Sequence, residues 1–155
     1  MASTNALTEA LDRAGVPYEL LEHSRTDRAA AEATALGLRP TEVAKTIVVT
    51  TGDENLRVIL PASERIDMHK LRDLLAAGKE LHLLTEEALG RDYPEFELGA
   101  VPPLGGRADA VVVDRRVTGL EQVVFEAGEH DRSVRVPTAE LVTATGARVG
   151  DVCAD

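Results

Sequence analysis

Lys45 is a charged residue at the start of an apolar, β-branched run that extends from Thr46 to Thr50. A run of this composition fits a pleated, largely buried strand. A lysine beside such a strand most often extends its ammonium group into solvent. It can also bind an anion or orient a substrate, because its charge is compact and its stem is long. Residue types alone favour solvation, so a functional role for Lys45 depends on whether other segments meet it.

The most distinctive loop occupies residues 99–106 and reads Gly-Ala-Val-Pro-Pro-Leu-Gly-Gly. Its prolines fix φ, and its glycines allow a ligand to approach the backbone closely. Such a loop can direct N–H groups at a carbonyl or an oxyanion, although a stiff surface connection is the simpler interpretation. Because proline has no N–H, the candidate donors are Gly99, Ala100, Val101 and Leu104.

Other candidates for chemistry are weaker. His23 is expected at the end of a short strand, where a surface or capping role is commoner than catalysis. Residues 114–116 predict an exposed turn, and Cys153 is expected on a frayed tail with no nucleophilic role. The sequence has no phosphate-binding loop, dinucleotide fingerprint or Gly-x-Ser-x-Gly elbow. Its four His and single Cys show no ligand spacing, which predicts no metal site and no cofactor.

The bulk composition limits the classes of partner. A length of 155 residues suggests one domain over residues 1–155, and the scarcity of aromatics predicts an aliphatic core. The formal net charge of −10 argues against tight binding to DNA or another polyanion, but allows weak contact through a local basic patch. One Cys, no signal-like segment and no long apolar run predict a cytoplasmic protein that does not enter a membrane.

Hydrophobic periodicity and capping residues predict helices and strands interspersed along the chain. The predicted helices cover residues 5–14, 26–36, 67–77 and 138–145, with a further short helix after Thr85. The predicted strands cover residues 18–22, 43–50, 56–60, 81–84, 110–114, 122–127 and 133–136. The second and third of these form an antiparallel hairpin, which argues against a purely parallel sheet. We therefore expect an α/β fold of the α+β type, with a curled, mixed and mainly antiparallel sheet flanked by helices.

Four segments in order carry a family resemblance. They are Val43-Ala44-Lys45-Thr46-Ile47-Val48, Leu60-Pro61-Ala62 ahead of a helix that opens at Asp67, residues 99–105, and Phe125-Glu126-Ala127-Gly128. In this order and spacing they resemble the YbaK/ProX family of aminoacyl-tRNA deacylases, which is related to the editing domain inserted in bacterial prolyl-tRNA synthetases. The resemblance implies a curled mixed sheet around a pocket. It also implies hydrolysis, in trans, of a mischarged amino acid from the 3′ end of tRNA.

The resemblance also assigns roles to residues. Lys45 matches the family's essential lysine, which is thought to bind or orient the tRNA end rather than to act as a nucleophile. Gly99–Gly105 matches the family loop that contacts the aminoacyl ester and stabilises the ester or oxyanion, with Gly99, Ala100 and Val101 as its catalytic residues. The further substrate-binding positions are His23, Thr46, Pro102, Pro103, Leu104, Gly105, Ala127, Gly128 and His130.

Two departures from the family pattern touch the pocket. Pro102 stands where many members carry Ser or Thr, so a side-chain hydroxyl is missing. Residues 24–27 read Ser-Arg-Thr-Asp, whereas this segment of the family often bears proline and aromatic residues. Both differences bear on amino-acid specificity more than on the reaction.

The implied reaction needs no internal pair of base and nucleophile, because an aminoacyl ester is already activated. Water attack requires positioning, oxyanion stabilisation and a proton acceptor, a part in which a ribose hydroxyl of the substrate could share. The expected partner is the acceptor end of an aminoacyl-tRNA, held weakly and transiently, and a synthetase or elongation factor could assist. A local basic rim could be formed by Arg25, Arg28, Arg65, Lys70 and Arg107.

Two other classes of function remain open from the residues alone. A non-catalytic module could hold a nucleotide or a free amino acid in the same pocket. A hydrolase could instead act on small aminoacyl or acyl esters unrelated to tRNA. Deacylation of a panel of charged tRNAs distinguishes these classes.

Overall fold

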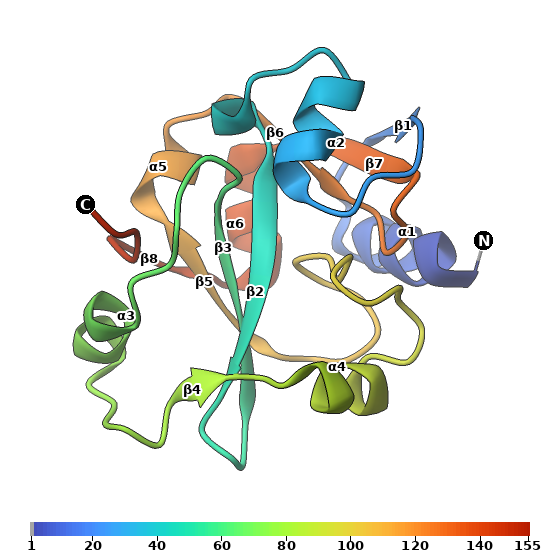
Figure 1. The fold of residues 1–155 in the computed structure, drawn as a ribbon. Helices are drawn as coiled ribbons and strands as arrows, with labels where there is room; N and C mark the ends of the chain where they lie inside the picture. Colours follow the sequence, from blue (N-terminus) through green and yellow to red (C-terminus); the bar gives the residue numbers. More distant parts are fainter. Residues whose placement is uncertain (1) are drawn as a thin grey trace.

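The computed structural model describes residues 2–155, which form two β-sheets with helices packed around them (Figure 1). The helices are α1 (Ala2–Ala14), α2 (Ala29–Ala35), the 3-10 helix η1 (Pro40–Glu42), α3 (Met68–Leu75), α4 (Glu86–Asp92), α5 (Arg115–Thr118) and α6 (Thr138–Thr145). The strands are β1 (Glu19–Glu22), β2 (Ala44–Thr50), β3 (Asn55–Pro61), β4 (His82–Leu83), β5 (Ala110–Asp114), β6 (Gln122–Glu126), β7 (Arg132–Pro137) and β8 (Arg148–Gly150). No helix in this part of the chain has both the length and the apolar character needed to cross a membrane.

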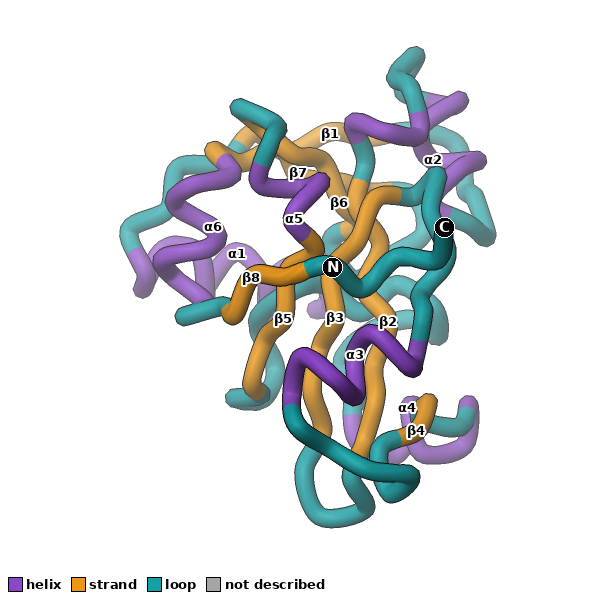
Figure 2. Tube along the Cα trace, turned by 90° about the vertical axis from the view of Figure 1, so that its left-hand side faces the viewer, coloured by secondary structure: helices purple, strands orange, loops and turns teal. Residues whose placement is uncertain are grey.

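The larger sheet has the strand order β4-β2-β3-β5-β8. β2 and β3 pair along their whole length as the predicted antiparallel hairpin, from Ala44 opposite Pro61 to Thr50 opposite Asn55. β5 and β8 extend this sheet in parallel. Figure 2 shows β2, β3 and β5 side by side, with α3 lying across one face. β4 pairs only with the far end of β2, which leaves the rest of that edge without a neighbouring strand.

The smaller sheet has the order β1-β7-β6, and both of its strand pairs are antiparallel. A single bridge between Val43 and Val124 links it to the larger sheet. Antiparallel pairs predominate over the two parallel ones, which confirms the predicted mixed α/β fold with flanking helices. The strands do not form one closed sheet, because within residues 2–155 that bridge is the only backbone pairing between the two sheets.

An aliphatic core holds the two sheets together, as the composition predicts. Leu7 and Leu11 of α1 pack with Ile59 of the larger sheet and Phe125 of the smaller one. A second cluster packs Leu71 of α3 against the opposite face of the larger sheet. Each such side chain contributes about 1.5–3 kcal/mol when it is fully buried. The core therefore packs against both faces of the larger sheet. The part of the β2 edge that β4 does not cover remains without a neighbouring strand.

The C-terminal segment differs from its prediction. The carboxylate of Asp114 is buried and accepts the N–H groups of Arg116 and Val152, so the expected exposed turn is instead the capped helix α5. β8 then joins the sheet, and Cys153 is buried rather than frayed. Burial raises the pKa of the Cys153 thiol to about 12, which favours the unreactive thiol over the thiolate.

Two helix boundaries also differ from those predicted from the sequence. α3 ends at Ala76, which adopts a left-handed conformation with φ of 52°, before the predicted stop at Gly78. α2 begins at Ala29 rather than near Thr26, because the N–H of Thr26 donates to His130 O across the molecule. This contact fixes the chain ahead of α2 beside the turn that joins β6 to β7.

Candidate active site

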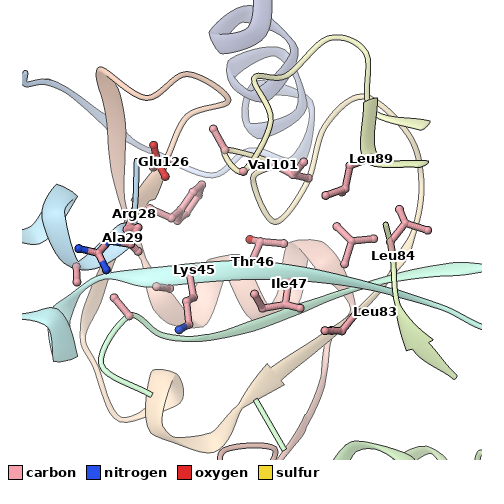
Figure 3. Close-up of a pocket in the computed structure, with 17 residues that line it drawn as sticks. Arg28, Ala29, Lys45, Thr46, Ile47, Leu83, Leu84, Leu89, Val101 and Glu126 are labelled. Carbon is pink, nitrogen blue, oxygen red and sulfur yellow. The ribbon is translucent and has the colours of Figure 1, made fainter. Parts of the chain in front are cut away.

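A pocket of about 530 Å³ lies along the open edge of β2 (Figure 3). This volume is within the usual range for sites that bind small molecules. Its walls come from α2, β2, the β4–α4 segment, the 99–101 loop and the end of β6. The lining residues are Arg28, Ala29, Ala30, Ala44, Lys45, Thr46, Ile47, Val48, Ala62, Leu83, Leu84, Leu89, Gly99, Ala100, Val101, Phe125 and Glu126.

The open edge of β2 presents backbone groups to this pocket. The carbonyl of Val48 accepts from Leu84 N at 3.0 Å, so the backbone groups of Val48 point toward the β4 side. Backbone direction alternates along a strand, so the N–H and C=O of Thr46 point to the same side. No hydrogen bond within residues 2–155 uses them. Thr46 therefore offers one donor and one acceptor at the pocket.

Lys45 and Thr46 extend to opposite faces of β2, and both line the pocket, which wraps around the strand edge (Figure 3). The Lys45 side chain is half-buried and forms no hydrogen bond or ion pair with the described residues. Burial, together with the nearby charge of Arg65, lowers the pKa of Lys45. The charge of Glu64 opposes this shift without forming an ion pair with Lys45, and a bound anion would oppose it further. Lys45 is therefore a half-buried cation at the pocket whose ammonium group is available to an anionic ligand.

The structure places only the first part of the predicted loop at the pocket. Gly99, Ala100 and Val101 line the pocket. The N–H of Ala100 donates to Glu97 O at 3.0 Å, so it is already used, whereas no such bond engages the N–H groups of Gly99 and Val101 within the described chain. Gly99 has a φ of +85°, a conformation that side-chain-bearing residues rarely adopt. Two backbone donors therefore remain as candidates for an oxyanion.

The second half of the loop is directed away from the pocket by Arg57. This guanidinium is 1% exposed and donates to Pro102 O at 2.9 Å, Gly105 O at 2.7 Å and Asp109 Oδ2 at 3.0 Å. Gly105 also packs tightly on α1, because a Cβ there would lie 2.9 Å from Ala6 O. Four of the predicted substrate-binding residues are consequently absent from the pocket lining: Pro102, Pro103, Leu104 and Gly105.

Four other predicted positions also lie outside the lining. His23 bonds to Ser24 O and Ser133 Oγ, and Ala127 belongs to the core between the sheets. Gly128 accepts the N–H of Glu97 through its carbonyl, which holds the base of the 99–101 loop. His130 is buried behind the pocket and bonds to Leu98 O at 2.6 Å. Gly128 and His130 therefore position the loop rather than face the pocket.

The predicted basic rim is smaller than expected. Arg25 pairs with Glu97, Lys70 with Asp151 and Asp155, and Arg107 with Asp109. The other two cations, Arg28 and Arg65, have side chains without an ion pair to any described residue. Arg28 lines the pocket, and the charge of Arg65 reaches Lys45. These two and Lys45 are the unpaired cations at or near the pocket among the described residues that the sequence singles out.

Glu126 is a pocket residue that was not predicted. It is 8% exposed, and its Oε2 lies 2.9 Å from His130 Nδ1. Because Leu98 O can only accept, His130 Nε2 carries a proton, so one further proton is shared between Nδ1 and Oε2. Burial raises the pKa of Glu126 to about 8. The sequence feature that could have identified Glu126 is its position as the one charged residue in the apolar strand predicted over residues 122–127.

A second buried carboxyl group lies behind Glu126. Glu32 of α2 is fully buried, and its Oε2 is hydrogen-bonded to Ser133 Oγ. Burial raises the pKa of Glu32 to about 8, and the nearby charge of Glu126 adds to the rise. Glu32 is therefore neutral in the folded protein at a pH where it would be ionised in the unfolded chain.

This difference predicts a pH-dependent stability. An acid whose pKa rises on folding stabilises the protein fully below 4.5, and that contribution is lost as pH rises to about 8. The melting temperature should therefore fall by several degrees across this window, and Glu32→Gln should flatten the fall. Calorimetry at a series of pH values measures it, with the exposed Glu9→Gln as the control. A slope unchanged in Glu32→Gln would contradict the prediction.

Together these features define an α/β protein with a pocket at the open edge of a mixed sheet, lined by a half-buried lysine on one face of β2 and by the 99–101 loop on the side of the other face. Residues 23–144 match the aminoacyl-tRNA editing domain family. The chain belongs to this family, which confirms the resemblance seen in the sequence.

Solved structures agree on the fold. The hypothetical protein APE2540 is 25% identical, with a TM-score of 0.87, and the match covers 96% of this chain and 99% of the other. A protein proposed to be a trans-editing enzyme for prolyl tRNA synthetase is 23% identical, with a TM-score of 0.86 and coverage of 99% and 98%. A protein from Marinobacter aquaeolei VT8, proposed to act in signal transduction, is 22% identical, with a TM-score of 0.73. This chain covers 31% of that longer protein, and 97% of this chain is matched.

Proposed function

We propose that the protein deacylates mischarged aminoacyl-tRNA in trans, by attack of water on the aminoacyl ester. The observation that carries this proposal is the pocket itself, in which Lys45 and the 99–101 loop of an editing-family chain line one cavity. An ester bound there would have its alcohol half near the cation and its carbonyl near the free backbone donors. The acceptor end of the tRNA is the partner, held weakly because the net charge is −10.

The mechanism divides the work between protein and substrate. Lys45 anchors the terminal phosphate or ribose, because its ammonium group has no partner in the protein. The N–H groups of Gly99 and Val101 stabilise the charge that develops on the carbonyl oxygen when water attacks. The ester bond to the ribose breaks, the ribose oxygen leaves as a hydroxyl, and the amino acid departs as its acid. The attacking water supplies the proton, and a neighbouring ribose hydroxyl relays it.

Deacylation of a tRNA panel tests the proposal directly. Purified protein is incubated with tRNA charged with Ala, Ser, Cys, Thr or Pro, and the release of the amino acid is followed. Release from one or two of these supports editing. If no tRNA is deacylated but nucleotides or free amino acids raise the melting temperature, the pocket belongs to a binding module. Hydrolysis of small esters alone would indicate an esterase unrelated to tRNA.

The cations available to a ligand predict a salt dependence. With phosphate contacts from Lys45, Arg28 and Arg65, kcat/KM should fall about 20-fold between about 50 and 200 mM salt, a slope near −2 on logarithmic axes. Arg65→Ala should reduce the slope by about 0.7, since one contact is removed. Arg91→Ala serves as the control, because Arg91 lies outside the pocket and pairs with Asp92. A flat response in the unaltered protein would contradict the electrostatic rim.

A further inference from the structure

Glu126 is the only acidic residue among those that line the pocket, and the pocket otherwise carries two cations and mainly apolar side chains. It is the last residue of β6 and is flanked by buried apolar residues, with Val124 and Phe125 before it in the strand and Ala127 directly after the strand. A buried carboxyl group in such a setting is unfavourable unless it is hydrogen-bonded or has a partner of opposite charge. Glu126 therefore needs an explanation that apolar packing does not provide.

The hydrogen bond to His130 accounts for only one of the two carboxyl oxygens. Oε2 contacts His130 Nδ1, whereas Oε1 has no hydrogen bond to any residue in 2–155. Whichever of the two groups holds the shared proton, Oε1 keeps lone pairs that can accept a hydrogen bond. His130 is itself fixed by Leu98 O, so the carboxyl group is held in one orientation at the wall of the pocket.

The charges of the pocket match a ligand of mixed sign. Lys45 lies on one side of β2 and Glu126 on the other, above the strand in the close-up view (Figure 3). Among the parts of an aminoacyl-tRNA terminus, the phosphate is anionic and the α-amino group is cationic. We propose that Glu126 binds the α-ammonium group of the aminoacyl ester, which restricts the pocket to substrates with a free amino group. This inference rests on the proposed function and adds to it a substrate class, excluding N-acylated and peptidyl-tRNA.

The positions of the neighbouring groups support this pose. The 99–101 loop, which offers its backbone donors to the ester carbonyl, is fixed to His130 through Leu98 O and to the β6–β7 turn through Gly128 O. The α-amino group is one carbon from that carbonyl, so the group that binds it must lie close to the same loop. Acylation would remove the positive charge, so Oε1 would lose the charge-assisted hydrogen bond from the ammonium group, and sites built around such a bond strongly reject ligands that lack it.

The test compares free and N-acetylated substrate. The best substrate of the tRNA panel is acetylated on its α-amino group, and kcat/KM is measured for both forms. The unaltered protein should prefer the free form by about 100-fold or more. Glu126→Gln should lower kcat/KM for the free form, leave the acetylated form unchanged, and reduce the preference to below about tenfold. Asp131→Asn should retain the full preference, because this exposed carboxylate on the β6–β7 turn lies outside the pocket.

The possible results of this test distinguish a failure of the Glu126 inference from a failure of the proposed deacylase function. Equal hydrolysis of both forms by the unaltered protein would overturn the inference and leave the deacylase intact, and this comparison needs no folded variant. An equal loss on both substrates in Glu126→Gln would show that Glu126 only supports the structure. Failure of the unaltered protein to release any amino acid from charged tRNA would overturn the proposed function, and the inference with it.

Discussion

Lys45→Ala should lower kcat/KM for deacylation by about 100- to 1,000-fold, which is the usual effect of removing a group that stabilises or orients charge at the reacting centre. The fold should persist, because the Lys45 ammonium makes no hydrogen bond or ion pair with the described residues. Steady-state deacylation of the best charged tRNA gives the rate, and thermal unfolding checks the structure.

Two variants sharpen this experiment. Lys79→Ala removes the same charge from an exposed loop outside the pocket, and it should leave kcat/KM unchanged. Lys45→Arg should recover only part of the activity, since a planar guanidinium does not reproduce a compact ammonium on a partly buried stem. Turnover by Lys45→Ala that equals that of the unaltered protein would remove Lys45 from the mechanism.

Arg57→Ala should destabilise the protein by about 3–5 kcal/mol, because it removes the buried cation from the buried Asp109 carboxylate and leaves the more exposed Arg107 as its ion-pair partner. The Arg57 and Asp109 side chains are 1% and 2% exposed. The guanidinium also holds three loop carbonyls and stacks over the Tyr93 ring at 5.1 Å. Denaturant unfolding measures the loss in free energy.

Arg107→Ala is the matched control for Arg57, because Arg107 contacts the same ring and the same carboxylate from a side chain that is 39% exposed. Its loss should be below about 1 kcal/mol, as is usual for exposed ion pairs. A loss of similar size in both variants would mean that burial does not set the strength of the Arg57 contacts. Residual activity in Arg57→Ala should also fall, since the loop loses its anchor.

The sequence predicted the elements well where local chemistry decides them. The β2–β3 hairpin follows from two β-branched runs around a Gly-Asp turn, and Asp67 and Thr85 cap their helices through their side chains as expected. The C-terminal segment could not be predicted in this way. Its order depends on Asp114, which accepts a hydrogen bond from a residue 38 positions away, and local propensity contains no information about such contacts.

In the candidate site, too, the features set by local sequence could be predicted, whereas those set by long-range contacts could not. Lys45 and Thr46 line the pocket, and a strand pattern and a family motif coincide at these two residues in the sequence. The sequence motif predicts one continuous ester-binding loop over Gly99–Gly105. In the structure, Arg57 of β3 binds the second half of this loop and holds it away from the pocket. Arg57 and Glu126 have the same identifying feature in the sequence. Each is a charged residue in the middle or at the end of an apolar strand, where burial demands a specific partner.

The opposite orientation of Lys45 and Thr46 on one edge strand has an evolutionary consequence. For a substrate that straddles β2, the nucleic-acid end and the amino-acid end are recognised on different faces of the same strand. Mutations on one face can then retune which amino acid is accepted while the other face keeps its hold on the tRNA. Neighbouring codons would then specify two traits that selection can change separately.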